Sequence, residues 1–231
     1  MTTVPAKTTP CSASIETPTP WRLWVDGALS GEENMRRDQE LLEGQRDPAA
    51  VPVVRFFRWA APTVSFGRLQ PRAGAESLAK AAGAGSAVQR PTGGGMVLHD
   101  RDLSFSIAWR RDLAGFPPCV KEVYRSFHGV VADLLCARGM DVAVHQPSKR
   151  LPIAPGVCFK EPADQDLLWC GEKVLGGALR VTRWGRLYQG DVRTEVLGLD
   201  PDELVQAITN GLAKKVFLTP PGKEQGGQKA V

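Results

Sequence analysis

The sequence predicts an α+β fold in which helices pack on a mixed or antiparallel sheet. Segments rich in β-branched and aromatic residues recur along the chain, and short turns that are typical of hairpins join many of them. Other segments have helical periodicity, so helices and strands must share one core. The chain has 231 residues, 42% of them hydrophobic and 23% charged, which is typical of a globular domain.

The N-terminal half is expected to contain most of the strands and two helices. Ser30 followed by Glu33 forms a capping box, which predicts a helix that continues to Leu42. An alanine-rich stretch predicts a shorter helix over residues 76–82. Apolar, β-branched and aromatic patterns predict strands over residues 21–26, 53–59, 63–66, 86–90, 96–98 and 103–109.

The C-terminal half contains the clearest helical pattern. Apolar residues recur at helical spacing from Val120 to Leu135, and Gly139 supplies the C-terminal stop. Residues 145–157 contain three prolines and two basic residues, which predicts a long exposed loop. A last helix is expected to start at Asp200, with Pro201 at its first position. Further strands are predicted over residues 141–144, 167–170, 173–181 and 187–193.

The ends of the chain differ in composition from the middle. Residues 1–20 consist mainly of Thr, Pro, Ser and Ala, and residues 218–231 are rich in Pro, Gly, Gln and Lys. These compositions predict two disordered tails around a single domain at 21–217. No apolar run approaches the roughly 20 residues of a membrane span. Residues 1–20 lack the apolar segment of a secretory signal, so we do not expect them to act as one. The net charge of +4 gives no indication of nucleic-acid binding. Five cysteines without a pairing pattern favour a reducing compartment, so we expect a cytoplasmic protein.

The sequence offers no metal-binding pattern, because it has no C-x-x-C pair and its histidines are scattered. Three cysteines, Cys119, Cys136 and Cys170, are expected to be small buried hydrophobic residues. Cys158 differs from them because it ends the long loop, where a neighbouring positive charge could activate its thiol. The alternative is that Cys158 is a buried structural residue as well.

A glycine triplet, Gly93 to Gly95, lies between two predicted strands. Such a segment lets a backbone pass close to a ligand, and its amides can bind an anion. A flexible hairpin turn would explain the glycines equally well. The segment is neither a P-loop nor a dinucleotide fingerprint, because no G-K-[ST] and no helix follow it. His99 and Asp100 cannot form a direct dyad, since adjacent strand residues point to opposite faces, and His99 could be purely structural.

Lys173 follows a tight turn and opens a predicted strand that contains Gly176, Gly177 and Ala178. Taken alone, it could be a solvated turn lysine. A lysine at the start of a strand, beside glycine-rich backbone, could instead hold a carbonyl or phosphate oxygen.

These segments, in this order, resemble the lipoate–protein ligase A and octanoyltransferase superfamily, which is related in fold to the biotin ligases. The family motif R-R-x-[ST]-G-G-G-x-V-x-H-D corresponds to Gln89–Asp100, and the motif D-L-x-V-x-G-x-K-[IV]-x-G-x-A corresponds to Asp166–Ala178. The resemblance covers residues 21–217. Gln89 replaces the first arginine, residues 163–166 depart from the usual P-S-x-Y-E, and Gln189-Gly190 stands where the family usually has His-Gly.

The resemblance implies an acyltransferase that moves octanoyl from acyl carrier protein to a lysine of a lipoyl-domain protein. The element Val157-Cys158-Phe159-x-x-Pro162 resembles the lipoyl-relay octanoyltransferases, in which the matching cysteine carries the acyl group. This implies that Cys158 and Lys173 are catalytic and that no cofactor or metal is needed. Substrate contacts are then expected from Arg90, Thr92, Gly93, Gly94, Gly95, His99, Gly176 and Ala178.

Two alternatives lead to different experiments. An ATP-dependent lipoate–protein ligase would use ATP and Mg²⁺, hold an acyl-adenylate at the glycine segment and Lys173, and have no need of Cys158. The ligases usually continue the H-D motif with L-G-N, whereas this chain has Asp102-Leu103-Ser104 there. The second alternative is a non-catalytic protein that binds acylated carriers, and any catalytic turnover would exclude it.

Overall fold

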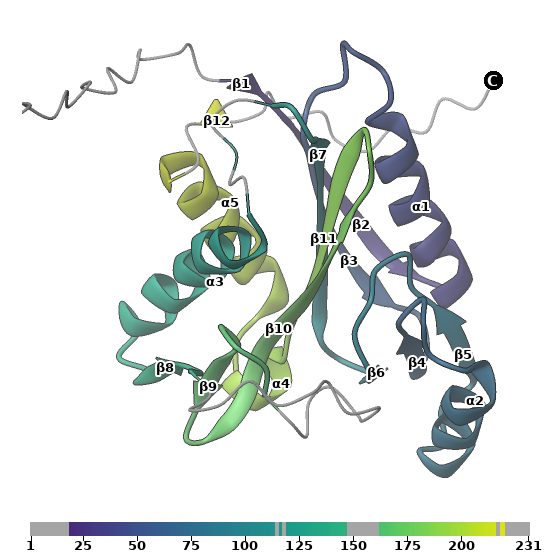
Figure 1. Cartoon of the computed structure of the whole chain (residues 1–231). Coiled ribbons are helices and arrows are strands. Elements are labelled where there is room, and N and C mark those ends of the chain that lie inside the picture. The colour runs from purple at the N-terminus through teal and green to yellow at the C-terminus, as the bar shows by residue number, and fades with distance from the viewer. Residues whose placement is uncertain (1–18, 114–115, 117–118, 147–161, 216–217, 220–231) are drawn as a thin grey trace, which may run out of the picture.

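The computed structural model describes residues 19–113, 116, 119–146, 162–215 and 218–219. A seven-stranded sheet runs through its centre (Figure 1). The first two strands in space are parallel and every other neighbouring pair is antiparallel, so the predicted mixed sheet is confirmed. In spatial order the strands are β2 (Arg22–Leu29), β3 (Val53–Trp59), β7 (Leu103–Arg110), β11 (Gly185–Val192), β10 (Glu172–Val181), β9 (Leu167–Trp169) and β8 (Val142–Val144).

Helices cover both faces of this sheet. Helices α3 (Val120–Cys136) and α5 (Pro201–Lys215) pack on one face, and α1 (Gly31–Gly44) lies on the other (Figure 1). The Ser30 side chain accepts a hydrogen bond from the Glu33 amide at the start of α1, so the predicted cap is confirmed. Within the described residues, no helix is long and apolar enough to cross a membrane.

A second, three-stranded sheet lies beside α1. Its central strand is β4 (Thr63–Phe66), which pairs in parallel with β5 (Ser86–Gln89) and antiparallel with β6 (Met96–His99). Helix α2 (Arg72–Ala81) packs against it through buried alanines and starts four residues before the predicted position. The glycine triplet therefore connects two strands of this small sheet.

The strands of the large sheet carry different chemistry on their two faces. On β7, Phe105 and Ile107 join the core under α3 and α5, whereas Ser104 and Ser106 are buried on the α1 face. On β3, Phe56 faces the same core and the neighbouring Arg55 faces α1. This alternation follows from the two-residue period of a strand, and it places buried polar groups between the large sheet, α1 and the small sheet.

Three features differ from the sequence-based expectation. Two residues of each predicted tail pair in parallel, as β1 (Thr19–Pro20) and β12 (Leu218–Thr219). A single helical turn, α4 (Thr194–Leu197), follows β11. The expectation that Cys119, Cys136 and Cys170 are buried is wrong, because all three are exposed free cysteines.

Candidate active site

A cavity that is partly open to solvent lies between the α1 face of the large sheet and the small sheet. Six of the predicted site residues line it: Arg90, Gly94, His99, Lys173, Gly176 and Ala178. Met35, Phe57, Trp59 and Val97 supply its apolar lining. Thr92, Gly93 and Gly95 do not line it, and Cys158 falls outside the described residues.

Arg90 holds the glycine segment in place. Its guanidinium donates to the carbonyl oxygens of Gly93 at 3.0 Å and Gly95 at 2.8 Å, and to Ser65 Oγ at 2.7 Å. Gly94 has a φ of +89°. Gly67 packs closely against it, because a Cβ at Gly67 would lie 2.2 Å from the Gly94 carbonyl oxygen. The segment is therefore fixed by a buried arginine and by close backbone packing, which a freely moving hairpin turn would lack.

Thr92 connects this segment to the large sheet. Its hydroxyl donates to Gln189 Oε1 at 2.6 Å, and Gln189 Nε2 donates to Asp38 Oδ2 on α1 at the same distance. The predicted contact residue Thr92 thus supports the cavity from behind. Gln89, which replaces the first arginine of the family motif, does not line the cavity. Its exposed side chain donates to the Arg68 carbonyl oxygen at 3.2 Å.

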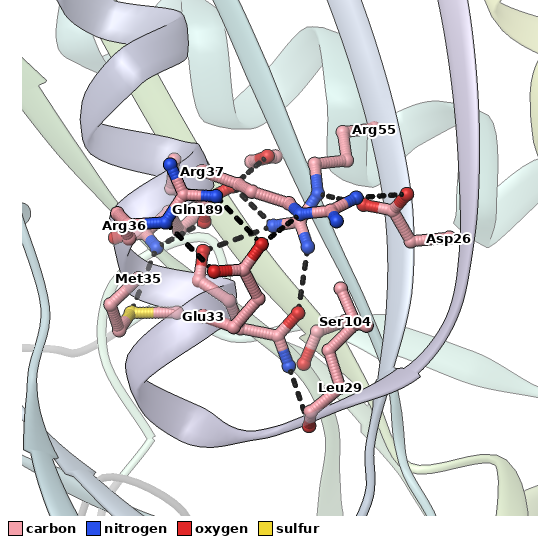
Figure 2. Close-up of polar contacts among 12 residues, drawn as sticks. Asp26, Leu29, Glu33, Met35, Arg36, Arg37, Arg55, Ser104 and Gln189 are labelled. Carbon is pink, nitrogen blue, oxygen red and sulfur yellow. Dashed lines mark hydrogen bonds and ion pairs between the residues drawn. The ribbon is translucent and has the colours of Figure 1, made fainter. Parts of the chain in front are cut away.

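Asp38 is fully buried, and Arg55 neutralises it. The Arg55 guanidinium lies 2.7 Å from Asp38 Oδ1 and 2.6 Å from Asp26 Oδ2, and it also donates to Asn34. Figure 2 shows the contact between Arg55 and Asp26. Burial raises the pKa of the Asp38 carboxyl, and the Arg55 charge opposes that rise. The wall behind Gln189 therefore depends on one buried ion pair.

Lys173 forms a second buried ion pair at the cavity. Its side chain is 6% exposed, and Nζ lies 2.7 Å from Asp166 Oδ2. Cys170 and Gly171, with φ of +51° and +80°, make the tight turn that precedes the lysine, as predicted. The interpretation as a solvated turn lysine is wrong. A Cβ at position 176 would lie 2.3 Å from Lys173 Cε, so the glycine makes room for this side chain.

His128 on α3 fixes the residues that precede Asp166. Burial lowers the pKa of His128 to about 4, so the ring is neutral at pH 7. Its Nδ1 donates to the Gln165 carbonyl oxygen and its Nε2 accepts from the Tyr188 hydroxyl. Gln165 has a φ of +74°, which is uncommon for a residue other than glycine. The histidine thus stabilises the turn that presents Asp166 to Lys173.

His99 lies at the centre of a charged cluster that also lines the cavity. Its Nδ1 lies 2.6 Å from Asp102 Oδ2 and 3.4 Å from Asp191 Oδ1, and its Nε2 lies 2.6 Å from Ser65 Oγ. The Trp59 ring stacks on the imidazole at 4.0 Å. Burial lowers the pKa of His99, but Asp102 and Asp191 outweigh burial and raise it to about 9. His99 is therefore cationic at pH 7, and its acidic partner is Asp102 rather than Asp100.

Among the described residues, the His99 cluster brings together side chains of the types that bind metal ions. Donor atoms of His99, Asp102 and Asp191 all lie within 4.8 Å of one another. Attraction between the imidazolium and the two carboxyl groups accounts for this closeness. The absence of a metal from the reaction stays a prediction.

Sequence reasoning did not single out Asp191, Asp102 and Ser65. A signal existed for Asp191, because it lies two residues after Gln189 on a predicted strand and must share its face. No local pattern could find Ser65, because its relation to His99 depends on the pairing of β4 with β6.

Comparisons with known proteins agree with this architecture. Residues 30–217 match the family described as the lipoyl protein ligase A/B catalytic domain. The octanoyltransferase LipM of Kyrpidia tusciae is 32% identical over 81% of this chain and 70% of its own length. LipM of Lysinibacillus sphaericus is 29% identical over 82% of this chain and 70% of its own length.

Solved structures share the fold at lower identity. A lipoate-protein ligase A bound with ATP superposes with a TM-score of 0.65 at 19% identity, over 86% of both chains. A bi-partite lipoate protein ligase from Thermoplasma acidophilum, studied with its E2 lipoyl domain, gives 0.58 at 17% identity, over 88% of this chain and 86% of the other. The expected lipoate-ligase fold is confirmed. This chain belongs to the lipoyl protein ligase A/B catalytic domain family and is an enzyme of that family.

Proposed function

We propose that this enzyme transfers an octanoyl group from acyl carrier protein to a lysine of a lipoyl-domain protein. Support comes first from the relatives called octanoyltransferase LipM, which align with four-fifths of the chain. The acceptor class is supported by the Thermoplasma ligase, which is described together with its E2 lipoyl domain. The donor class rests on the sequence resemblance around residues 157–162.

One observation carries the proposal: a single cavity combines an apolar lining with a buried lysine. Met35, Phe57, Trp59 and Val97 offer the surface that a saturated acyl chain prefers. Lys173 lines the same cavity, and Asp166 fixes its amine. A positive charge at this position suits the oxygen of a thioester carbonyl, which becomes negative when a nucleophile attacks.

The proposed chemistry has two steps. The Cys158 thiolate attacks the octanoyl thioester, its sulfur binds the acyl carbon, and the carrier thiol leaves. The acceptor lysine then attacks the acyl-enzyme, which forms an amide and returns the Cys158 thiol. Lys173 would favour the thiolate and the oxyanion in both steps. We propose that neither a nucleotide nor a metal is required.

Intact mass spectrometry tests this proposal directly. The enzyme is incubated with octanoyl carrier protein without ATP, and we expect a mass increase of one octanoyl group, absent in Cys158→Ala. Cys170→Ala is the matched control, because Cys170 is an exposed free cysteine and should leave the adduct intact.

The same experiment separates the alternatives. Transfer to a lipoyl domain that strictly needs ATP, Mg²⁺ and a free acid, with no use of the thioester, would establish the ligase instead. Near-normal transfer by Cys158→Ala would also contradict the acyl-enzyme.

A further inference from the structure

Asp191 on β11 is a buried acid in the cavity to which the proposed chemistry gives no role. It is 7% exposed and lines the cavity. Ser104 donates to its Oδ1 at 2.6 Å. No group among the described residues donates a hydrogen bond to its buried Oδ2, although the Asp102 carboxyl interacts with the same side chain. A carboxylate oxygen left without a partner is costly, so such an atom in a cavity calls for an explanation.

Asp191 and Lys173 line the same cavity from neighbouring strands. Asp191 is paired across the sheet with Gly176, and directly paired residues carry their side chains on the same face, about 5 Å apart at Cβ. Lys173 fills the space above Gly176, since a Cβ there would lie 2.6 Å from Nζ. The Lys173–Asp166 ion pair therefore lies beside Gly176, next to the strand that carries Asp191 and on the side of the sheet that faces the cavity.

Burial and the charges around Asp191 bring its pKa close to neutral pH. His99 from β6 and Asp102 before β7 are the charged groups that interact with it. The Lys173–Asp166 ion pair lies beside Gly176, which is paired with Asp191, and Arg90 lines the same cavity. Burial raises the pKa of Asp191, the Asp102 carboxylate raises it further and cationic His99 opposes both, which leaves it at about 7. At neutral pH the group can therefore both accept and release a proton.

We propose that Asp191 is the general base that removes a proton from the acceptor lysine before that lysine attacks the acyl group. This inference rests on the proposed function, because it presupposes an acyl-enzyme and an amine acceptor. An acceptor lysine is an ammonium at pH 7 and cannot attack until one proton leaves. Lys173 is paired with Asp166 and is itself a proton donor, so a second group is needed for this task.

The proton transfers balance as follows. The acceptor ammonium gives one proton to Asp191, and its nitrogen forms a bond to the acyl carbon. The carbon–sulfur bond breaks, and the Cys158 thiolate departs. The second proton of the nitrogen passes to that thiolate, which gives the amide and the free thiol. Asp191 returns its proton to solvent and is ready for another cycle.

The decisive variant is Asp191→Asn, which keeps an acceptor for the Ser104 hydroxyl but cannot take a proton. The two half-reactions are measured separately. Formation of the octanoyl adduct should stay within about threefold of wild type. Transfer from the preformed adduct to a lipoyl domain, in single turnovers, should slow by a factor of roughly 100 to 10,000. Under turnover the adduct should accumulate.

The pH profile distinguishes a base from a merely structural residue. Wild-type transfer should rise with pH and level off above about 7, as Asp191 loses its proton. In Asp191→Asn this plateau should vanish, and the rate should keep rising toward the acceptor's own pKa, about 10.4 for an ordinary lysine. In Asp191→Ala, added formate should restore part of the transfer rate. Asp112→Asn, the same substitution at an exposed acid, should behave as wild type.

Three outcomes would overturn the proposal: transfer within fivefold of wild type in Asp191→Asn, an unchanged pH plateau, or equal loss of both half-reactions without formate rescue. Failure of the proposed function shows up differently, as a wild-type enzyme that forms no adduct. In that case the same variants are compared on transfer from an ATP-derived octanoyl-adenylate, where the acceptor amine must lose the same proton.

Discussion

Replacing Arg55 by methionine tests whether one buried charge supports both the fold and the cavity wall. Arg55 is 0% exposed, and its guanidinium neutralises Asp26 and Asp38, which lie 2.6 and 2.7 Å away. Methionine fills similar space without charge, so Asp38 would remain buried and unpaired. Removing one partner of a buried pair costs about 3–5 kcal/mol of unfolding free energy. For a domain of this size that corresponds to a decrease in Tm of about 6–20 °C.

The loss should depend on pH in a definite direction. Burial already raises the pKa of Asp38, and without the Arg55 cation it would rise further. An acid whose folded pKa exceeds its unfolded value, about 3.9, destabilises the fold increasingly as pH rises above that unfolded value. Arg55→Met should therefore be mildly destabilised near pH 4.5 and strongly destabilised at pH 8.

Urea unfolding at the two pH values measures this effect. The double variant Arg55→Met with Asp38→Asn should recover most of the stability, because no unpaired charge remains. Arg36→Met is the matched control, since Arg36 is an exposed arginine of α1 and solvent screens its ion pairs, so its replacement should change stability little. A loss below about 1 kcal/mol at pH 8, or a loss that does not change with pH, would refute the reasoning.

Three further predictions concern the site and its supports. Lys173→Arg should lower turnover by a factor of roughly 100 to 1,000 with little change in acceptor KM, because a planar guanidinium cannot replace a compact ammonium. A variant that keeps more than a tenth of wild-type activity would contradict this. Gly177→Ala should cost about 1–3 kcal/mol by urea unfolding, since its Cβ would lie 2.3 Å from the Tyr188 hydroxyl oxygen; an unchanged midpoint would contradict it. Protonated His99 should contribute about 3 kcal/mol to the unfolding free energy below pH 6.5, and this contribution should be lost as the pH rises through 9. His99→Gln should therefore flatten the dependence of stability on pH between pH 6 and 10. An equal slope in both proteins would contradict the assignment.

The elements of this fold were predictable because their signals are local. The capping box at Ser30 and the proline at 201 mark helix starts, and alternation marks the strands of the large sheet. The burial of the cysteines was predicted wrongly from residue type alone. The helical periodicity of α3 could have predicted that Cys136 is exposed, because the buried residues Val131 and Leu135 lie on another face of that helix.

The site could be predicted only where a motif carried it. The glycine segment and Lys173 were expected at one site, and the structure places Arg90, Gly94 and Lys173 around one cavity. The partners of these groups could not be read locally. Arg90 reaches Ser65 across 25 residues, and Asp191 reaches His99 across the gap between the two sheets. Such pairs depend on how the two sheets sit together, which no short spacing in the sequence encodes.

The register of β11 connects the stability of the core to the chemistry of the cavity. Tyr188 and Val192 face the core under α3 and α5, so Gln189 and Asp191 must face the cavity. Gly190 secures this register, because a Cβ there would lie 2.5 Å from the Phe105 ring on the neighbouring strand. A slip of one residue would turn an aromatic ring into the cavity and bury the acid in the core. The apolar face of β11 thus determines the position of its polar face, and the packing of the core positions the proposed base.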